Sequence, residues 1–388
     1  MTYMTDVVEL TRQLVRMETI NPPGQEEECA RWLSGFLRDI GFKAELIPFG
    51  TGRYNLMAEL RGTGAGKLLA FSGHMDTVPL GQGAWSVDPF AGEIREGRLY
   101  GRGATDMKSG IAAFLVACIQ SRDVIDASAG VRILLTGGEE TGCDGARALR
   151  ERLPGYLDNV GALIVGEPTQ NYPFVGHKGA LWLRGAAQGI TAHGAMPEAG
   201  DNAIYKIVDA IDRLRKFALV HQHPLMGGAS MNVGTVSGGL NVNSVPDAAR
   251  FEVDLRTVPG MEHDKLRNEL ATLLGDDVQL SAFVDVPPLE TSETHPWLQR
   301  VFACCAPECG QIIPKVVPYF TDGSVLVSDS SVPVVILGPG EPQTMHKTDE
   351  YCRVDRLYEG VRVYGRILHD WQDGSVNASG APVFAVAN

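Results

Sequence analysis

The sequence of 388 residues predicts an α/β protein in which a smaller α+β domain is inserted into a larger domain with a mostly parallel sheet. Short apolar runs alternate with helix-length segments before about residue 177 and again after about residue 290, which is typical of a parallel sheet crossed by helices. Between these points, apolar and polar residues alternate, as in strands buried on one face. The length also exceeds what a single hydrophobic core usually serves.

The larger domain is expected to comprise residues 1–176 and 290–388. Its predicted helices cover residues 5–18, 25–40, 108–121, 145–153, 296–305 and 355–371. The first two have the apolar spacing of amphipathic helices, and residues 108–121 have helical length and small residues for close packing. Its predicted strands are short apolar runs: residues 42–48 and 54–60, KLLAFSGH, VRILLTGG, VGALIVGE and VPVVILG. KLLAFSGH, VRILLTGG and VGALIVGE are predominantly apolar without regular alternation, which suits strands buried on both faces.

The inserted domain is expected to comprise residues 177–289. Its segments follow the order β-α-β-β-α-β: ALWLRGAAQG, DNAIYKIVDAIDRLRKFA, SMNVGTVSGG, AARFEVDLRTV, HDKLRNELATLL and VQLSAFV. This order, with strands that are apolar on one face only, is the signature of a ferredoxin-like domain.

Composition excludes some partners. The net charge of −13 argues against nucleic acid and against an anionic membrane surface, because both need a basic face. No apolar run approaches the ~20 residues of a membrane span. The first residues lack the basic and apolar regions of a secretory signal, and the seven scattered cysteines suggest reduced thiols, so a cytoplasmic protein is expected. The CCAPEC cluster contains no CxxC pair and continues a helix, which favours a structural role over a thiolate metal site.

Metal-binding side chains follow the ends of five apolar or glycine-rich segments. They are His74, Asp106, Glu140, Glu167 and His346. Open α/β sheets bind ligands at the carboxyl ends of their strands, so these side chains are expected to converge. Imidazole and carboxylate suit Zn, Mn or Co, and a set without thiolate argues against a structural zinc cage. Five ligands suit two ions that share one carboxylate, for which Asp106 is the best candidate.

Two more carboxylates adjoin this set. Asp76 lies two residues after His74, where it could accept the second imidazole N–H and orient the ring; the alternative is a solvated loop residue. Glu139 precedes Glu140 and points in a different direction. It could remain free as a general base, whereas the alternative is a salt-bridged surface glutamate.

Three residues of the inserted domain have both an ordinary and a functional interpretation. His193 is either structural or a donor to an oxyanion. Arg256 is either a solvated strand residue or a fork for a substrate carboxylate. Asn243 lies at a turn, where asparagine is common. RGTGAGKLL is not a phosphate loop, because it precedes a strand and lacks the Ser or Thr after Lys67.

The motifs SGHMDTVP, GRGATDMKSG, GGEETG, GEPT, TAHGAMPEAGDNAI, NSVP, TDGS and MHKTDE together resemble the M20 metallopeptidase and deacylase family. That family includes acetylornithine deacetylase, succinyl-diaminopimelate desuccinylase and carboxypeptidase G2. The resemblance covers nearly the whole chain. It implies a zinc-peptidase-like catalytic domain and an inserted dimerisation or lid domain.

The resemblance also implies the parts played by individual residues. Two Zn²⁺ ions, or Co²⁺ or Mn²⁺, would be bound, one by His74, Asp106 and Glu167 and the other by Asp106, Glu140 and His346. Glu139 would be the general base, Asp76 the orienting acid, and His193 an oxyanion stabiliser in the site of a partner subunit. The residues that would contact substrate are Asn243, Arg256, Thr321 and Gly323. The Asp106–Met107 peptide would be cis.

The predicted function is therefore that of a dizinc amidohydrolase. It would remove an acetyl, succinyl or similar group from a small N-acyl amino acid or related amide, by attack of a metal-bound hydroxide with Glu139 moving the proton. Glu167, where some relatives have aspartate, favours a deacylase. The alternatives are a dipeptidase or carboxypeptidase with the same metals, and a non-catalytic protein that binds metal or amino acids. A homodimer is expected, with no nucleic-acid or membrane partner.

Overall fold

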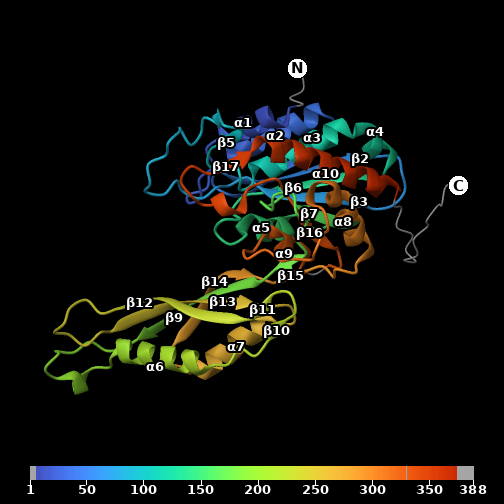
Figure 1. Cartoon of the computed structure of the whole chain (residues 1–388). Coiled ribbons are helices and arrows are strands. Elements are labelled where there is room, and N and C mark those ends of the chain that lie inside the picture. The colour runs from blue at the N-terminus through green and yellow to red at the C-terminus, as the bar shows by residue number, and fades with distance from the viewer. Residues whose placement is uncertain (1–5, 329, 374–388) are drawn as a thin grey trace. The chain divides into compact units, whose positions relative to one another are not determined.

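The computed structural model describes residues 6–328 and 330–373 (Figure 1). The chain divides into two compact units. Unit 1 comprises Met1–Val175, Thr291–Lys315 and Thr321–Asn388. Unit 2 comprises Gly176–Glu290 and Val316–Phe320. The inserted unit is thus formed by one continuous segment and a short segment that returns to it, where Val317 forms an isolated bridge with His177.

A six-stranded sheet forms the centre of unit 1. In spatial order its strands are β1 (Lys43–Gly50), β2 (Arg53–Arg61), β6 (Gly130–Thr136), β3 (Leu68–His74), β7 (Val160–Val165) and β16 (Val334–Ile336). The pairs β1–β2 and β2–β6 are antiparallel, and the remaining three pairs are parallel. Every residue of β3 and β6 is buried, as their short, predominantly apolar sequences predict. The predicted α/β class is confirmed.

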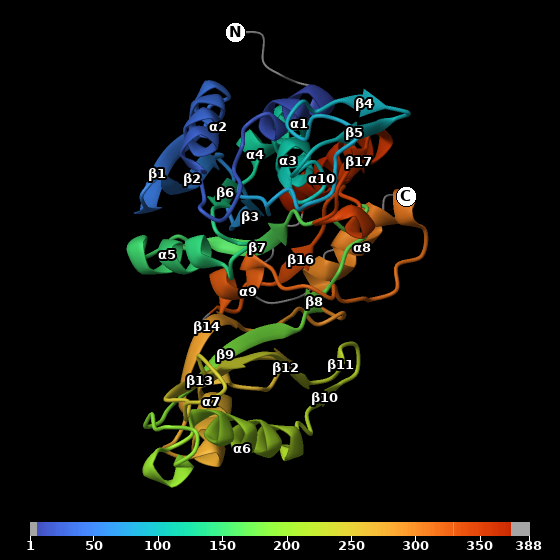
Figure 2. The ribbon, with the colours of Figure 1, turned by 90° about the vertical axis from the view of Figure 1, so that its left-hand side faces the viewer.

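Helices cover both faces of this sheet. They are α1 (Val7–Val15), α2 (Glu27–Asp39), α3 (Lys108–Gln120), α4 (Arg122–Ala127), α5 (Asp144–Arg152), α8 (Pro296–Cys309), α9 (Asp322–Val327) and α10 (Val354–Asp373). Figure 2 shows α1, α3 and α10 on one side of the sheet and α5 and α9 on the other. Phe114 of α3 stacks on Phe71 of β3, with ring centroids 4.2 Å apart, and Tyr364 of α10 packs edge-on against both. This aromatic cluster fixes α3 against the central strand.

A small three-stranded sheet in unit 1 has no counterpart in the sequence prediction. Its order is β17 (Tyr351–Arg353), β5 (Arg98–Tyr100) and β4 (Ile94–Arg95), all antiparallel. Strands of two or three residues are too short to show a period in sequence. The sheet joins the segment after His346 to the segment before Asp106, so it matters for the site.

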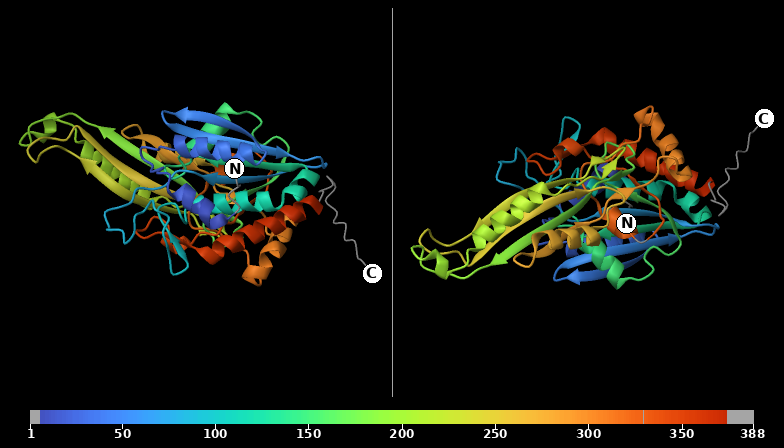
Figure 3. Two further views of the ribbon diagram at one scale, coloured as in Figure 1. Left: turned by 90° about the horizontal axis from the view of Figure 1, so that it is seen from above. Right: turned by 90° about the horizontal axis from the view of Figure 1, so that it is seen from below.

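Unit 2 contains a four-stranded antiparallel sheet. Its spatial order is β12 (Ser230–Gly238), β13 (Ala248–Thr257), β9 (Gly179–Gln188) and β14 (Gln279–Val286). The helices α6 (Ala203–Lys216) and α7 (His263–Leu274) run along this sheet (Figure 3). Their apolar faces share one core with the strands, with Leu183, Phe251 and Leu270 fully buried. The strand order is that of a ferredoxin-like fold, as predicted.

Two short strand pairs complete unit 2. β10 (Gln222–His223) and β11 (Gly227–Gly228) form a hairpin, and β8 (Gly176–His177) pairs with β15 (Leu289–Glu290). His223 of the hairpin has its Nε2 3.0 Å from Oε1 of Glu290 in β15. All seven cysteines are free thiols. Within residues 6–328 and 330–373, every helix is too short or too polar to cross a bilayer.

Candidate metal centre

The structure brings the five predicted metal ligands together in two groups. One group is His74, Asp106 and Glu167, and the other is Asp106, Glu140 and His346; in each, the ligand atoms lie within 4.8 Å of one another. Among the described residues, no other set of three or more His, Cys, Asp or Glu side chains meets this criterion. Asp106 belongs to both groups, as expected of a shared ligand.

The two oxygens of Asp106 face different groups. Oδ1 lies 3.1 Å from His74 Nε2, while Oδ2 lies 3.3 Å from His346 Nε2. The remaining carboxylates complete the groups: Glu167 Oε1 is 3.8 Å from His74 Nε2, and Glu140 Oε2 is 3.0 Å from His346 Nε2. One carboxylate therefore presents one oxygen to each of two neighbouring ligand sets.

Parallel strand pairing explains why residues so distant in sequence meet. β3 lies between β6 and β7 and is parallel to both, so all three strands end at the same edge of the sheet. His74 ends β3, opposite Thr136 of β6, and the loops that follow β6 and β7 begin at this edge. The N-terminal turn of α3 approaches closely, because a Cβ on Gly110 would come within 2.0 Å of the carbonyl oxygen of Gly166. Glycine at 110 therefore permits the Asp106 loop to reach the Glu167 segment.

The electrostatics show an excess of buried negative charge. Burial and the adjacent Asp106 raise the pKa of Glu140 to about 7, against the hydrogen bond from His346. Burial and Asp106 also raise the pKa of Glu167 well above its ordinary value. Hydrogen bonds to Asp106 and Glu140 raise the pKa of His346 to about 10. One oxygen of Glu140 is buried without a hydrogen-bond partner.

This donor set fits two divalent cations. Three carboxylates and two imidazoles, without a thiolate, are ligands that Zn²⁺, Co²⁺ and Mn²⁺ accept. Two cations would compensate the negative charge of the clustered carboxylates, and one of them would provide a partner for the unpaired oxygen of Glu140. The residues that could hold them are His74, Asp106 and Glu167 for one ion, and Asp106, Glu140 and His346 for the other.

Asp76 contacts the site differently from the expectation. His74 Nδ1 is 2.9 Å from the backbone carbonyl oxygen of Asp76 but 3.6 Å from its carboxylate. The closer partner that can fix the imidazole is therefore the carbonyl. The Asp76 carboxylate instead accepts the backbone N–H groups of Glu139, at 3.2 Å, and Glu140, at 3.3 Å. It also accepts a hydrogen bond from Asn21 Nδ2 at 2.8 Å.

Glu139 is buried beside the centre and belongs to neither ligand group. Burial raises its pKa well above the ordinary value; His74 opposes the shift, and the carboxylates of Glu167 and Asp322 add to it. The Cys143 thiol lies 4.0 Å from Oε1. A carboxyl group in this setting can accept and return a proton next to the ligand sets.

Asp322 is a residue of this region that the sequence analysis missed. Thr321 and Gly323, its neighbours in TDGS, were predicted to bind substrate; both are buried, and Thr321 Oγ1 accepts the Gly323 N–H at 3.2 Å as the cap of α9. Asp322 itself is buried, accepts a hydrogen bond from Thr136 Oγ1, and has one buried oxygen without a partner. Burial raises its pKa to about 6. The acidic residue inside an otherwise small, polar motif was the available signal.

The remaining predicted residues belong to unit 2. His193 and Asn243 lie in adjacent segments, because His193 forms a bridge with Ser244 and Gly194 N–H donates to Asn243 O at 2.8 Å. Arg256 lies near the opposite end of β13, where its Nε is 2.9 Å from Asp254 Oδ1 and its guanidinium is 5.8 Å from the ring centroid of Trp182. From Ala248 to Arg256 the strand alone spans roughly 27 Å, at about 3.4 Å per residue. Unit 2 of one chain therefore holds Arg256 far from the other two.

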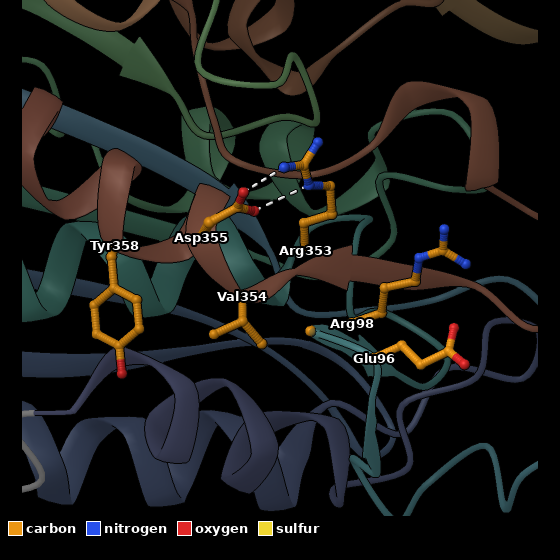
Figure 4. Close-up of a pocket in the computed structure, with 7 residues that line it drawn as sticks. Glu96, Arg98, Arg353, Val354, Asp355 and Tyr358 are labelled. Atoms are coloured by element: carbon orange, nitrogen blue, oxygen red, sulfur yellow. Dashed lines mark hydrogen bonds and ion pairs between the residues drawn. The ribbon is translucent and has the colours of Figure 1, made fainter.

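A separate surface pocket in unit 1 contains none of the predicted site residues. Its volume is about 600 Å³, and its lining comprises Glu96, Gly97, Arg98, Arg353, Val354, Asp355 and Tyr358 (Figure 4). Arg353 Nε is 3.0 Å from Asp355 Oδ1, and Arg98 lies over the ring of Tyr351. The arginine and acidic side chains of this pocket compensate one another.

Comparison with curated proteins identifies relatives along nearly the whole chain. One is a protein named probable succinyl-diaminopimelate desuccinylase from Staphylococcus epidermidis strain RP62A, 30% identical over 395 residues, with 92% of this chain and 96% of the relative covered. Another is an acetylornithine deacetylase from Vibrio atlanticus, 31% identical over 359 residues, with 89% and 90% covered.

Solved structures share the fold at lower identity. An M20 family metallo-carboxypeptidase from Sulfolobus solfataricus superposes with a TM-score of 0.77 at 18% identity, covering 95% of this chain and 99% of the other. A dinuclear metal-binding M20 peptidase from Bacillus subtilis gives a TM-score of 0.69 at 16% identity, with 95% and 97% covered. Residues 70–370 match the sequence pattern of peptidase family M20/M25/M40. The resemblance drawn from the motifs is thereby confirmed, and the chain belongs to the M20 family of metallohydrolases.

Proposed function

We propose that this protein is a dimetal amidohydrolase that removes an acyl group from the nitrogen of a small, carboxylate-bearing amine. The single observation on which the proposal rests is the pair of ligand groups that share Asp106, with the buried, uncoordinated Glu139 beside them. The two relatives at about 30% identity are named as deacylases, and Glu167 agrees with that class. The structural neighbours named as peptidases share at most 22% identity among those compared, and support the fold only.

The metal ions, with Zn²⁺ first and Co²⁺ or Mn²⁺ as substitutes, would lower the pKa of a water molecule and polarise the amide carbonyl when bound. In this proposal a carboxylate oxygen of Glu139 takes the proton of the attacking water and later delivers it to the departing amine nitrogen. Asp76 holds the backbone N–H groups of Glu139 and Glu140, which fixes the direction of the base relative to its neighbour. Arg256 binds the substrate carboxylate, and Asn243 of the partner subunit assists it.

A homodimer through unit 2 would complete this site. β12 is an edge strand, and apolar side chains are exposed on it and near it, including Val236, Leu240 and Val242. An unpaired edge with exposed apolar residues favours association with another chain. His193 and Asn243 lie beyond one end of β13 and Arg256 lies near the other end. This separation suggests that the two ends of β13 serve different active sites, one in each protomer. The free thiols agree with a reducing, cytoplasmic environment.

Arg256→Ala is expected to raise KM for N-acyl amino acids by roughly 10–100-fold with little change in kcat, because it removes a charge-assisted hydrogen bond to a carboxylate that does not react. The measurement is steady-state hydrolysis of N-acetyl and N-succinyl amino acids, and of dipeptides, by the metal-loaded enzyme. Arg250→Ala is the matched control, since Arg250 lies on the same strand and is exposed. Hydrolysis of dipeptides in preference to every acyl amino acid would favour the peptidase alternative; no metal-dependent amide hydrolysis would contradict the proposal.

His193→Ala is expected to lower kcat by roughly 100–1,000-fold, the usual loss when one donor to an oxyanion is removed. His193 is proposed to act in the active site of the partner subunit. A mixture of His193→Ala and Glu139→Gln chains should therefore regain activity. In such a hybrid dimer, one site combines an intact Glu139 with the partner's intact His193. Purified hybrids bearing two different affinity tags provide the measurement. Hybrids no more active than either parent would show that His193 does not act across the dimer.

A further inference from the structure

We infer that Glu350, held by Arg102, is a positioning residue for the shared ligand Asp106. Glu350 lies four residues after His346 and is 1% exposed. Its Oε1 accepts the backbone N–H of Thr105 at 2.9 Å and the backbone N–H of Asp106 at 3.1 Å. A single carboxylate oxygen from the His346 loop thus binds two consecutive peptide groups of the loop that carries Asp106.

This contact acts on the feature of Asp106 that the two ligand groups require. The Asp106 carboxylate must direct Oδ1 towards His74 and Oδ2 towards His346, so its plane must be fixed. A rotation of the backbone at residue 106 would turn both oxygens away together. Hydrogen bonds from backbone N–H groups to an ionised carboxylate are short and strong, which makes Glu350 an effective restraint on that rotation.

Arg102 connects Glu350 to the loop that follows His74. Its Nη1 is 2.5 Å from Glu350 Oε2 and donates to the carbonyl of Lys347 at 3.3 Å. Its Nη2 donates at 3.0 Å to the carbonyl of Pro79, in the segment that follows His74. The guanidinium carbon lies 5.2 Å from the centre of the Trp85 ring. Arg102 is 1% exposed, so this buried ion pair joins the loops of His74, Asp106 and His346.

Stability alone is a poor reason for such a pair. Removing two charges from water costs about as much free energy as their attraction returns, and apolar residues of similar volume often replace a buried pair without loss. Two groups that meet three ligand-bearing loops are better explained as supports of the ligands. Supporting contacts of this kind commonly change metal affinity by roughly 10–100-fold when they are removed.

The test compares two double variants that both lack the buried charges. Arg102→Met with Glu350→Gln keeps an amide oxygen that can accept the N–H groups of Thr105 and Asp106. Arg102→Met with Glu350→Met keeps similar volume but offers no acceptor. The inference rests on the proposed metal centre, and the readout is binding of Co²⁺ alone: stoichiometry, affinity and the visible absorption spectrum of the bound ion. Far-ultraviolet circular dichroism and thermal unfolding without metal monitor the fold.

The double variant with Glu350→Gln is expected to bind two Co²⁺ ions with affinities within roughly threefold of wild type. The double variant with Glu350→Met is expected to bind them at least roughly tenfold more weakly, with a changed spectrum, although it unfolds at a similar temperature without metal. Wild-type Co²⁺ affinity and spectrum in the double variant with Glu350→Met would overturn the inference. If that variant does not fold, Glu350→Asp replaces it, since the charge is kept but the carboxylate is withdrawn by one methylene; wild-type Co²⁺ binding by that variant would equally overturn it. Failure of the wild-type protein to bind two ions would instead contradict the proposed function.

Discussion

Replacing Glu139 with glutamine is expected to lower kcat by roughly two to four orders of magnitude while both metal ions remain bound. Glu139 lies outside both ligand groups, so its loss removes no ligand. Glutamine has the same size and can keep the packing of this buried side chain, but it cannot accept a proton at ordinary pH. The water would lose its base and the departing amine its acid, and both steps would slow.

The measurement pairs turnover of an N-acyl amino acid with metal content of the same sample. Glu140→Gln is the matched control, because the adjacent residue belongs to the group with Asp106 and His346 and its replacement should weaken metal binding. The two neighbours should therefore differ in kind: one variant inactive with its metals, the other inactive because a metal is lost. A Glu139→Gln enzyme with near-normal kcat would exclude Glu139 as the base, and one that lost its metals would make it a ligand.

The sequence was sufficient to predict that the five candidate ligands converge, because their positions follow from local patterns. The runs ending at His74, before Glu140 and before Glu167 are short and predominantly apolar, so each predicts a buried strand with a metal-binding side chain at or just past its end. Parallel pairing then places those ends at one edge of the sheet. The order of unit 2 was predictable for a similar reason, since its alternating strands and periodic helices extend over eight residues or more.

The supporting contacts could not be predicted, because they join residues far apart and have no period. Glu350 reaches the backbone of Thr105 across 245 positions of the chain, through a sheet whose strands are two or three residues long. Asn21 reaches Asp76 across 55 positions from a loop that sequence shows only as a turn. The carboxylate of Asp76 was expected to orient His74 and lies instead closer to two backbone N–H groups. Side-chain direction within a loop depends on tertiary packing that local composition does not encode.

Asp106→Asn is expected to weaken the binding of both metal ions, whereas replacing any other ligand should act chiefly on one. Asp106 is the residue common to the two groups, and each group uses a different oxygen of its carboxylate. Asparagine keeps the size but offers one neutral oxygen and an amide nitrogen that cannot bind a cation. We expect metal affinity to fall by more than the roughly 10–100-fold cost of a lost supporting contact. kcat should fall by roughly 1,000-fold or more, beyond the loss of one oxyanion donor.

Titration with Zn²⁺, followed by calorimetry and by metal content after dialysis, measures this difference. Glu167→Gln and Glu140→Gln are the matched controls, because each removes the charge of a ligand that belongs to one group only. Each control should leave one tight site, while Asp106→Asn should leave none of wild-type affinity. An Asp106→Asn protein that retained one site unchanged would mean that the carboxylate serves a single ion. The two groups would then be independent sites, and the case for water activated between paired cations would fail even though all five ligands lie at one edge of the sheet.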